Sequence, residues 1–514
     1  MSKTIIIIGA GLAGLSAALQ AAENGCNVKL VSSLPSERAQ SVMAEGGINA
    51  ALNTKDENDS PEEHFTDTIK AACGLADPNA VWGMTQAAPE LVHWLLKLGV
   101  KFNMSGYDDV DLRNFGGQKK KRTAFAQSDT GKQIMTAMID AVRRKEASGM
   151  VERFSHHSFL TLRLCGNICC GCVIRDEYSQ EIVELPGNAV IVASGGMHGL
   201  FGNTTGSLSN TGEVTAELFR LGVPLANGEM IQYHPTTVEC GGKRMLISEA
   251  ARGEGGRLFA LRNNQPWYFM EEKYPELGNL MPRDITAREI WKVSHESEVF
   301  LDMTEISKEI ISNKLSGLAD DCMTYLHKDI RKEPVPVLPG IHYFMGGILV
   351  DEQHRTSIQN LYAAGECCAQ YHGANRLGGN SLLGALYGGR VAAKSACEQA
   401  DGVVLSCAAQ IDIPPVQEIV GTKQLNQAMQ DSLGVVRNGN SLLKGIRKVQ
   451  ELKGTLPLLG LAVLQSAFAR KESRGAHWRE DYPECNNRDF LKTTVARFDG
   501  KQIQISFKSV PERR

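Results

Sequence analysis

The chain has 514 residues, enough for roughly three domains with substantial apolar cores. Its 55 basic and 58 acidic residues give a formal net charge of −3, which indicates no general affinity for nucleic acids or anionic membranes. No apolar run approaches the roughly 20 residues that span a bilayer, so no direct membrane insertion is predicted. We expect a cytoplasmic protein, or one attached to the inner face of the cytoplasmic membrane only through partner subunits.

A dinucleotide-binding fingerprint occupies the N-terminus. A short apolar, β-branched run at residues 3–8 is followed by the glycine turn GAGLAG and then by a helical pattern rich in Ala and Leu. Strand, tight turn and helix in this order bind a pyrophosphate. Gly9 makes the turn, Gly11 lets the pyrophosphate approach the backbone, and Gly14 lets the helix pack on the sheet.

The second predicted strand, residues 27–31, ends in two hydroxyl side chains instead of the acid that usually binds the ribose. Ser32 and Ser33 stand at this position. Both can hydrogen-bond a ribose, although less decisively than a carboxylate. The end of this strand is therefore the predicted ribose site.

Four of the 13 cysteines cluster in the segment LCGNICCGCV: Cys165, Cys169, Cys170 and Cys172. The segment alternates like a β-hairpin that turns at residues 166–167, and cysteine is a common small buried residue. We therefore expect these side chains to pack in a core, with no metal and no iron–sulfur centre in this chain. The scattered cysteines show no disulfide framework, which favours a reducing compartment.

The predicted elements divide the chain into a main α/β unit with one insertion. Residues 1–231 and 340–400 carry the apolar strands that a cofactor-binding sheet needs. The intervening block, 232–339, has mixed short strands and helices and is predicted to be a cap. Residues 401–514 form a helical domain with a tail, in which helical patterns cover 417–434, 438–452 and 455–471 and a strand-like run covers 502–507. The predicted fold class is α/β: a Rossmann-like cofactor-binding domain with an inserted α+β capping domain and a C-terminal helical domain.

Two later segments combine cationic side chains with a helix start. GIHYFMGG supplies His342, and HGANRLGGNSLL supplies Arg376 followed by a glycine-rich turn that opens a helix at Asn380, Ser381 and Leu382. The unpaired N–H groups and the dipole of that helix start would stabilise a reduced flavin or another electron-rich ring. This arrangement suggests an acidic substrate beside a redox ring.

With these residues in place, the chain resembles the flavoprotein subunits of succinate dehydrogenase and fumarate reductase, with L-aspartate oxidase as a close relative. The resemblance covers nearly the whole length. It rests on the ordered motifs GAGLAGLSAAL, AEGGINAAL, FGGQKKKRTAFAQSDTGKQI, MIQYHPTT, ISEAARGEGG, MPRDITARE, HGANRLGGNSLL and ARKESRGAHWREDYP. It implies an FAD-binding domain, a capping domain and a C-terminal helical domain that together interconvert fumarate and succinate.

The resemblance also implies the roles of the site residues. The positions that hold the two substrate carboxylates match His234, Ser248, His342 and Arg376, and Phe115 lies beside the substrate. Arginine offers a bidentate fork for a carboxylate, while histidine and serine add single donors. Arg283 matches the arginine that donates the proton to fumarate, and Glu249 and Arg252 match the residues that resupply that proton.

Further positions match contacts to FAD. These are Gly46 and Gly47, where the backbone comes close to the flavin, Glu366, which binds the ribityl chain, and the helix start at residues 380–382. Many membrane-bound relatives attach FAD covalently to a histidine in SHTVAAQGG. The corresponding segment here is AQSVMAEGG, with Gln40 in place of that histidine. We therefore expect non-covalent FAD and fumarate reduction as the favoured direction.

Two alternatives stay open. L-aspartate oxidase also binds FAD without a covalent bond, but Phe115 offers no charge for the ammonium group of aspartate. A non-catalytic flavin-binding protein of the same fold would be expected to have lost the substrate-binding side chains. For the favoured function we expect an iron–sulfur subunit as partner, and a membrane anchor or another electron donor.

Overall fold

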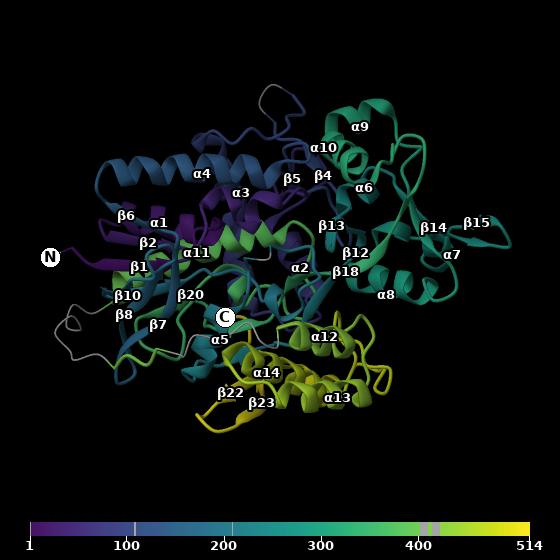
Figure 1. The fold of residues 1–514 in the computed structure, drawn as a ribbon. Helices are drawn as coiled ribbons and strands as arrows, with labels where there is room; N and C mark the ends of the chain where they lie inside the picture. The colour runs from purple at the N-terminus through teal and green to yellow at the C-terminus, as the bar shows by residue number, and fades with distance from the viewer. Residues whose placement is uncertain (1, 107–108, 208, 401–409, 414–421) are drawn as a thin grey trace.

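A five-stranded parallel sheet lies at the centre of the largest domain (Figure 1). The computed structural model describes residues 2–106, 109–207, 209–400, 410–413 and 422–514. In spatial order the strands are β20 (Leu361–Ala363), β10 (Ala189–Val192), β1 (Thr4–Ile8), β2 (Asn27–Ser32) and β6 (Val151–Ser155). The central strand, β1, is buried on both faces, which explains its unbroken apolar sequence.

The two faces of this sheet are covered by different layers. Ile5 and Ile7 pack against helices, whereas Ile6 and Ile8 pack against a three-stranded β-meander, because successive strand side chains point to opposite faces. The helices are α1 (Leu12–Glu23), α3 (Pro78–Leu98), α4 (Thr130–Ala147) and α11 (Asn380–Gln399). The strands of the meander are β7 (His157–Cys165), β8 (Ile168–Asp176) and β9 (Ile182–Pro186).

The cysteine-rich segment forms the predicted β-hairpin, with β7 and β8 joined by a turn at residues 166–167. Cys169, Cys170 and Cys172 are fully buried, so the packing prediction is confirmed for them. For Cys165 it is wrong, because this residue is disulfide-bonded. Local alternation predicted the hairpin but carried no information about a disulfide.

The inserted block forms a separate apolar core, on the right of Figure 1. One of its sheets joins β12 (Ile231–Cys240) to β13 (Lys243–Leu246) and β18 (Leu338–Phe344). A second sheet contains β14 (Arg257–Arg262), β15 (Gln265–Trp267), β16 (Val299–Asp302) and β17 (Val335–Pro336). The helices are α6 (Glu249–Gly253), α7 (Phe269–Lys273), α8 (Arg283–Val293), α9 (Lys308–Lys314) and α10 (Ser316–Asp321). This mixture of short elements agrees with the predicted α+β cap.

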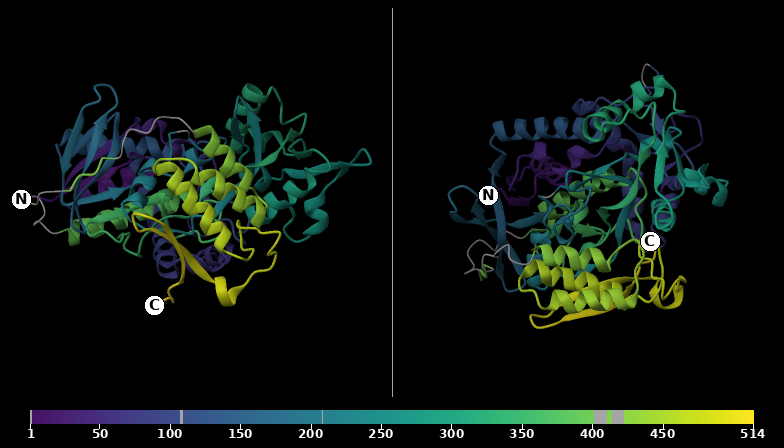
Figure 2. Two further views of the ribbon diagram at one scale, coloured as in Figure 1. Left: turned by 60° about the horizontal axis from the view of Figure 1, so that its bottom comes forward. Right: turned by 45° about the vertical axis from the view of Figure 1, so that its right-hand side comes forward.

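The C-terminal part packs beneath the main domain, where Figure 2 shows its helices grouped together. Its helices α12 (Thr422–Ser432), α13 (Gly439–Gln450) and α14 (Thr455–Ala469) share an apolar core with α5 (Glu213–Arg220). The first residues of the predicted helix 417–434 lie outside the described residues. In the part of the chain that is described, no helix has both the length and the apolar character needed to cross a membrane.

A second sheet ties this part to the main domain. The predicted strand near residue 502 is present as β23 (Ile503–Ser509), and it pairs with β22 (Lys492–Phe498), which was not predicted. On its other side β22 pairs with β11 (Leu225–Ala226), and the sheet continues through β19 (Gly347–Leu349) to β21 (Cys368–Ala369). The C-terminal strands therefore extend a sheet whose other members come from residues 225–369.

Candidate functional site

A cavity of about 630 Å³ runs from the turn between β1 and α1 to the cap. The structure brings most of the predicted site residues to its wall, together with Gln40: Gly9, Gly11, Ser32, Ser33, Gly46, Gly47, Phe115, His234, Ser248, Glu249, Arg283, His342, Glu366, Arg376, Ser381 and Leu382. Three predicted site residues do not line the cavity: Gly14, Arg252 and Asn380. Segments more than 300 residues apart in the sequence thus surround one space.

The glycine turn after β1 is shaped by close backbone packing. A Cβ atom at Gly9 would lie 2.2 Å from the carbonyl oxygen of Ala193, and Gly9 has a φ of +110°. A Cβ atom at Gly14 would lie 1.8 Å from the carbonyl oxygen of Gly9, so glycine there lets α1 cross directly over the turn. The N-cap of α1 is Gly11, and the N–H of Leu12, the first helical residue, donates to the Ser41 hydroxyl at 3.2 Å.

The end of β2 fits a ribose. The Ser32 side chain is buried, its hydroxyl oxygen has no hydrogen-bond partner, and the residue lines the cavity. A buried hydroxyl without a partner is costly unless a ligand satisfies it. Ser33 lines the same space but is exposed. These residues and the glycine turn before α1 fit the ribose and pyrophosphate of a dinucleotide.

The start of α11 presents backbone donors to the cavity. Its N-cap, Gly379, has a φ of +83° and leaves the first turn without a side-chain cap. The side chain of Asn380 points away from the cavity and accepts hydrogen bonds from Asn49 Nδ2 at 2.7 Å, while its own amide donates to Thr68 Oγ1 at 2.9 Å. The backbone N–H of Asn380 donates to the carbonyl of Leu377 at 3.2 Å, so Asn380 supports the turn, while Ser381 and Leu382 line the space directly.

Three other predicted cofactor contacts border the middle of the cavity. A Cβ atom at Gly46 would lie 2.8 Å from the ring of Phe115, so the bare backbone here fits between that ring and the cavity. A Cβ atom at Gly47 would likewise lie 2.5 Å from the carbonyl oxygen of Ala124. Glu366 is fixed by the backbone N–H of Phe344, which donates to its carboxylate at 3.1 Å.

Gln40 lies at the wall of the cavity, on the short helix η2 (Gln40–Met43). The backbone N–H of Ser207 donates to its side-chain oxygen at 2.5 Å. The amide is therefore held by protein contacts, and it carries no nucleophilic ring nitrogen that could attach to a flavin.

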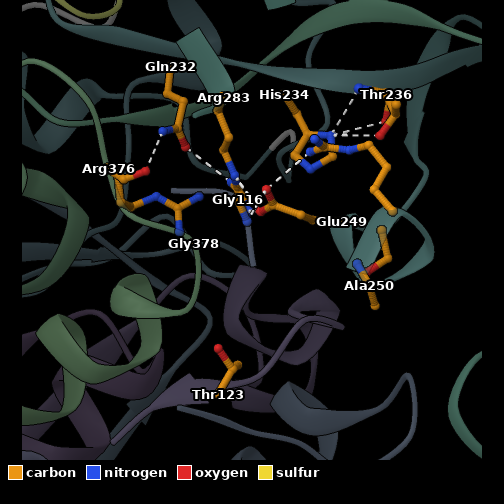
Figure 3. A network of polar contacts seen from close by, with 12 residues as sticks. Gly116, Thr123, Gln232, His234, Thr236, Glu249, Ala250, Arg283, Arg376 and Gly378 are labelled. Atoms are coloured by element: carbon orange, nitrogen blue, oxygen red, sulfur yellow. Dashed lines mark hydrogen bonds and ion pairs between the residues drawn. The ribbon is translucent and has the colours of Figure 1, made fainter. Parts of the chain in front are cut away.

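The cap contributes a buried chain of ionised groups (Figure 3). Arg283, the first residue of α8, donates from Nε and Nη2 to Glu249 Oε2 at 2.8 and 2.5 Å. The other carboxylate oxygen, Oε1, accepts from Arg252 Nη2 at 3.1 Å and from the backbone N–H of Gly116 at 3.2 Å. Burial alone would raise the pKa of Glu249, but the charges of Arg283 and Arg252 outweigh it and hold that pKa below the ordinary value. The carboxylate is therefore ionised and continuous with both guanidinium groups.

Two neutral histidines contact each other on the wall of the cavity. The rings of His234 and His342 lie 5.1 Å apart in an edge-to-face arrangement. Burial, and then the charge of Arg283, lower the pKa of both far below the ordinary histidine value. His342 Nδ1 is hydrogen-bonded to the hydroxyl of Thr205 at 2.8 Å, which orients the ring. Both imidazoles are thus neutral donors or acceptors and add no charge.

Arg376 is a further buried cation on the cavity wall, beside Arg283. Its side chain is buried, and its Nε atom has no hydrogen-bond partner. Burial, and then the nearby charge of Arg283, lower the pKa of Arg376 to about 9, so it stays protonated at neutral pH. With Arg283 and Arg252 it gives three guanidinium groups, whose charge the carboxylates of Glu249 and Glu366 offset only in part. This excess of positive charge, with an unsatisfied donor on Arg376, favours an anionic ligand.

Sequence reasoning missed several residues of the site. Gln232 accepts a hydrogen bond from Arg283 Nη1 at 3.1 Å, and it donates to the backbone carbonyl of Arg376 at 2.9 Å (Figure 3). Its position two residues before His234 on a strand was an available signal, because such residues share a face. Glu45, also on the wall, carries a carboxyl whose pKa is raised to about 8, mainly by burial and then by Asp321. Nothing local in AEGG indicated that burial.

The comparisons with known proteins agree with this geometry. The sequence matches the FAD binding domain family over residues 4–382 and the family described as fumarate reductase flavoprotein C-term over residues 454–513. The chain therefore belongs to the family of succinate dehydrogenase and fumarate reductase flavoprotein subunits, and it is an FAD-dependent oxidoreductase.

Its similarity extends over whole relatives. It is 39% identical to the succinate dehydrogenase flavoprotein subunit of Bacillus subtilis, with 96% of this chain and 94% of the relative covered. It is 32% identical to the 8-methylmenaquinol:fumarate reductase flavoprotein subunit of Wolinella succinogenes, over 99% and 91% of the two chains. A solved quinol fumarate reductase chain of E. coli superimposes with a TM-score of 0.88 at 28% identity, over 99% and 97%. These matches confirm the predicted fold class.

Proposed function

We propose that this protein reduces fumarate to succinate at a non-covalently held FAD. The observation that carries the proposal is the wall formed by Arg283, Arg376, His234 and His342 at the cap end of the cofactor cavity. Fumarate is a planar dianion of the size that such a wall would surround. The two arginines supply opposite charge, and the two neutral histidines supply single hydrogen bonds without adding charge repulsion between cations.

The substrate contacts divide between the two lobes. Arg376 and His342 would bind one carboxylate from the side of the FAD-binding domain, and His234 with Ser248 would bind the other from the cap. Phe115, which is buried between Gly46 and Gly378, offers an apolar surface to the carbon skeleton. Charge placed around a carboxylate also stabilises the negative charge that develops when a neighbouring carbon is reduced.

Reduction of the double bond needs a hydride at one carbon and a proton at the other. FAD, once reduced by an electron donor and bound in this cavity, would supply the hydride. Arg283 is proposed to supply the proton, which is an unusual role because free arginine is a very weak acid. Its double hydrogen bond to the ionised Glu249 and the onward bond to Arg252 support this role, because the proton lost from Arg283 can be replaced through hydrogen bonds already formed.

The cofactor, direction and partners are part of the same proposal. Gln40 cannot form the histidyl link of covalent relatives, and the resemblance associates that link with succinate oxidation, so its loss favours fumarate reduction. The relatives are named as flavoprotein subunits. We propose an iron–sulfur subunit as electron donor and attachment to the inner face of the cytoplasmic membrane through partners.

The cap is proposed to close over the substrate. Its boundaries, at 231/232 and 339/340, lie on β12 and β18, which pair with each other at the junction with the FAD-binding domain. The remaining boundary is proposed at 400/401. Closure would bring Arg283 and His234 onto a substrate already bound by Arg376, and it would exclude water from the reacting carbons.

Steady-state turnover tests the proposal. The purified flavoprotein should oxidise reduced viologen when fumarate is added under anaerobic conditions, with inhibition by malonate. L-aspartate with oxygen should release no peroxide, because Phe115, which lines the cavity at the proposed substrate position, offers no charge for the substrate ammonium. Peroxide release with aspartate and no fumarate turnover would instead identify an aspartate oxidase.

A further inference from the structure

The residues next to the two cavity arginines are hydrogen-bonded to each other. Asn375 precedes Arg376 on the FAD-binding domain, and Asp284 follows Arg283 on helix α8 of the cap. The Asn375 side chain is 2% exposed, and its Nδ2 donates to Asp284 Oδ1 at 3.0 Å. The contact therefore joins the two lobes directly beside both functional side chains.

The other end of the Asn375 amide is also used. Its Oδ1 accepts from Gln232 Nε2 at 2.9 Å, and the same Nε2 donates to the backbone carbonyl of Arg376. Gln232 in turn accepts from Arg283 Nη1. Because both ends of both amides have partners, neither side chain can rotate without breaking a buried hydrogen bond.

Asp284 is held from its far side as well. Arg288, one helical turn later on α8, lies 4.0 Å from its carboxylate. The guanidinium of Arg288 stacks over the ring of Trp478, 4.1 Å from the ring centre. Trp478 follows α14, and its backbone carbonyl accepts from the N–H of Arg437 at 2.9 Å. A continuous chain of contacts thus runs from the C-terminal domain through the cap to the segment that carries Arg376.

Such a restraint has a physical reason. Arg283 and Arg376 carry like charges in one buried cavity, and repulsion between them would push the cap away from the FAD-binding domain when no dianion lies between them. Catalysis requires the opposite, because a displacement of about 1 Å at a reacting group can reduce a rate by about 10²-fold.

We propose that Asn375, Asp284, Arg288 and Trp478 form a clasp that holds the cap closed and positions Arg283 opposite Arg376. The inference rests on the proposed function, since it assigns positioning roles for that reaction. None of the four side chains is assigned a contact with substrate or cofactor. Their role is to fix the distance between the two arginines that make such contacts.

A reciprocal substitution tests the clasp. Asn375→Asp places two carboxylates together, and Asp284→Asn keeps an acceptor oxygen but removes the negative charge that faces Arg288, so each single variant disturbs the chain of contacts. The double variant restores one carboxylate and one amide with the donor on the opposite side, while the group at position 375 can still accept from Gln232. We expect each single variant to lose at least tenfold in kcat with normal FAD content, and the double variant to recover to within about threefold of the wild type.

Trp478→Leu tests the outer part of the clasp. Because Trp478 is partly exposed, this variant still tests the clasp if the variants at Asn375 or Asp284 fail to fold. The matched control is Trp267→Leu, which removes a tryptophan stacked on Arg262 entirely within the cap. We expect Trp478→Leu, and not the control, to increase protease cleavage near residues 230 and 340 and to raise KM for fumarate.

Failure of the clasp can be distinguished from failure of the proposed fumarate reduction. A wild-type protein that does not reduce fumarate would contradict the proposed function. Protease cleavage can be measured without turnover, so the comparison of Trp478→Leu with Trp267→Leu would still test the clasp. The clasp would be refuted by single variants with wild-type kcat, by a double variant no better than either single one, or by equal cleavage of Trp478→Leu and Trp267→Leu.

Discussion

Replacing Arg283 with lysine or alanine separates proton donation from substrate binding. In the structure Arg283 makes two hydrogen bonds to Glu249 and one to Gln232. Lysine keeps one positive charge but cannot reproduce the planar fork, so the bonds to Glu249 and Gln232 cannot both keep their geometry. Alanine removes all three. In both variants Glu249 keeps its bonds to Arg252 and to the N–H of Gly116, so the buried carboxylate stays paired and the fold should persist.

The expected loss is in kcat. A positioned general acid contributes roughly 10²–10⁴-fold, which corresponds to about 3–5 kcal/mol of the activation barrier. We expect Arg283→Ala to lose at least the lower value, and Arg283→Lys to bind fumarate moderately well while turning over poorly. FAD content should stay unchanged, because no cofactor contact is assigned to this residue.

The assay is anaerobic fumarate reduction with reduced viologen, measured over a range of substrate concentrations. Arg262→Ala is the matched control, since Arg262 is an exposed arginine on a cap hairpin and does not line the cavity. If Arg283→Ala kept nearly wild-type kcat and only raised KM, the residue would be another carboxylate ligand and the proton-donor role would be wrong.

Three further predictions concern the cofactor, the second arginine and a buried acid. Acid precipitation should release all flavin into the supernatant, because Gln40 cannot bond to it; flavin fluorescence on the denatured protein band would contradict this. Arg376→Ala should raise KM and lower kcat, since the side chain binds substrate in ground and transition states alike; an unchanged KM would remove it from the site. The pKa of Glu45 is raised to about 8 in the folded protein, so its contribution to folding stability is present below pH 4.5 and is lost as pH rises to about 8. Glu45→Gln should therefore flatten the fall in unfolding free energy across that interval, by at most about 1.4 kcal/mol per pH unit; parallel curves for the two proteins would contradict the shift.

Local patterns in the sequence predicted the elements that depend on neighbouring residues. The strand, turn and helix around Gly9 follow from apolar residues and glycine spacing, and the hairpin near Cys169 follows from alternation. The substrate wall was predicted from motifs, and the structure places those residues together, although their roles remain predictions.

Contacts between distant segments could not be predicted in this way. The pairing of β22 with β11 depends on where the chain returns after hundreds of residues. The disulfide at Cys165 left no signal in the alternation of its own hairpin. The bonds of Gln232 and Asn375 depend on how the cap meets the FAD-binding domain. Asn380 belonged to a correctly placed helix start, but its side-chain direction is set by Asn49 and Thr68, which lie more than 300 residues earlier.

The central claim is that this cavity brings fumarate to a reduced flavin, and a single-turnover experiment tests it most directly. The FAD-loaded protein is reduced under anaerobic conditions and mixed rapidly with fumarate, while the absorbance of oxidised flavin is followed. The proposal predicts that this absorbance returns in one saturable phase, that malonate prevents it, and that succinate forms in equal amount to the flavin. If the flavin stayed reduced at saturating fumarate, the proposed function would be wrong.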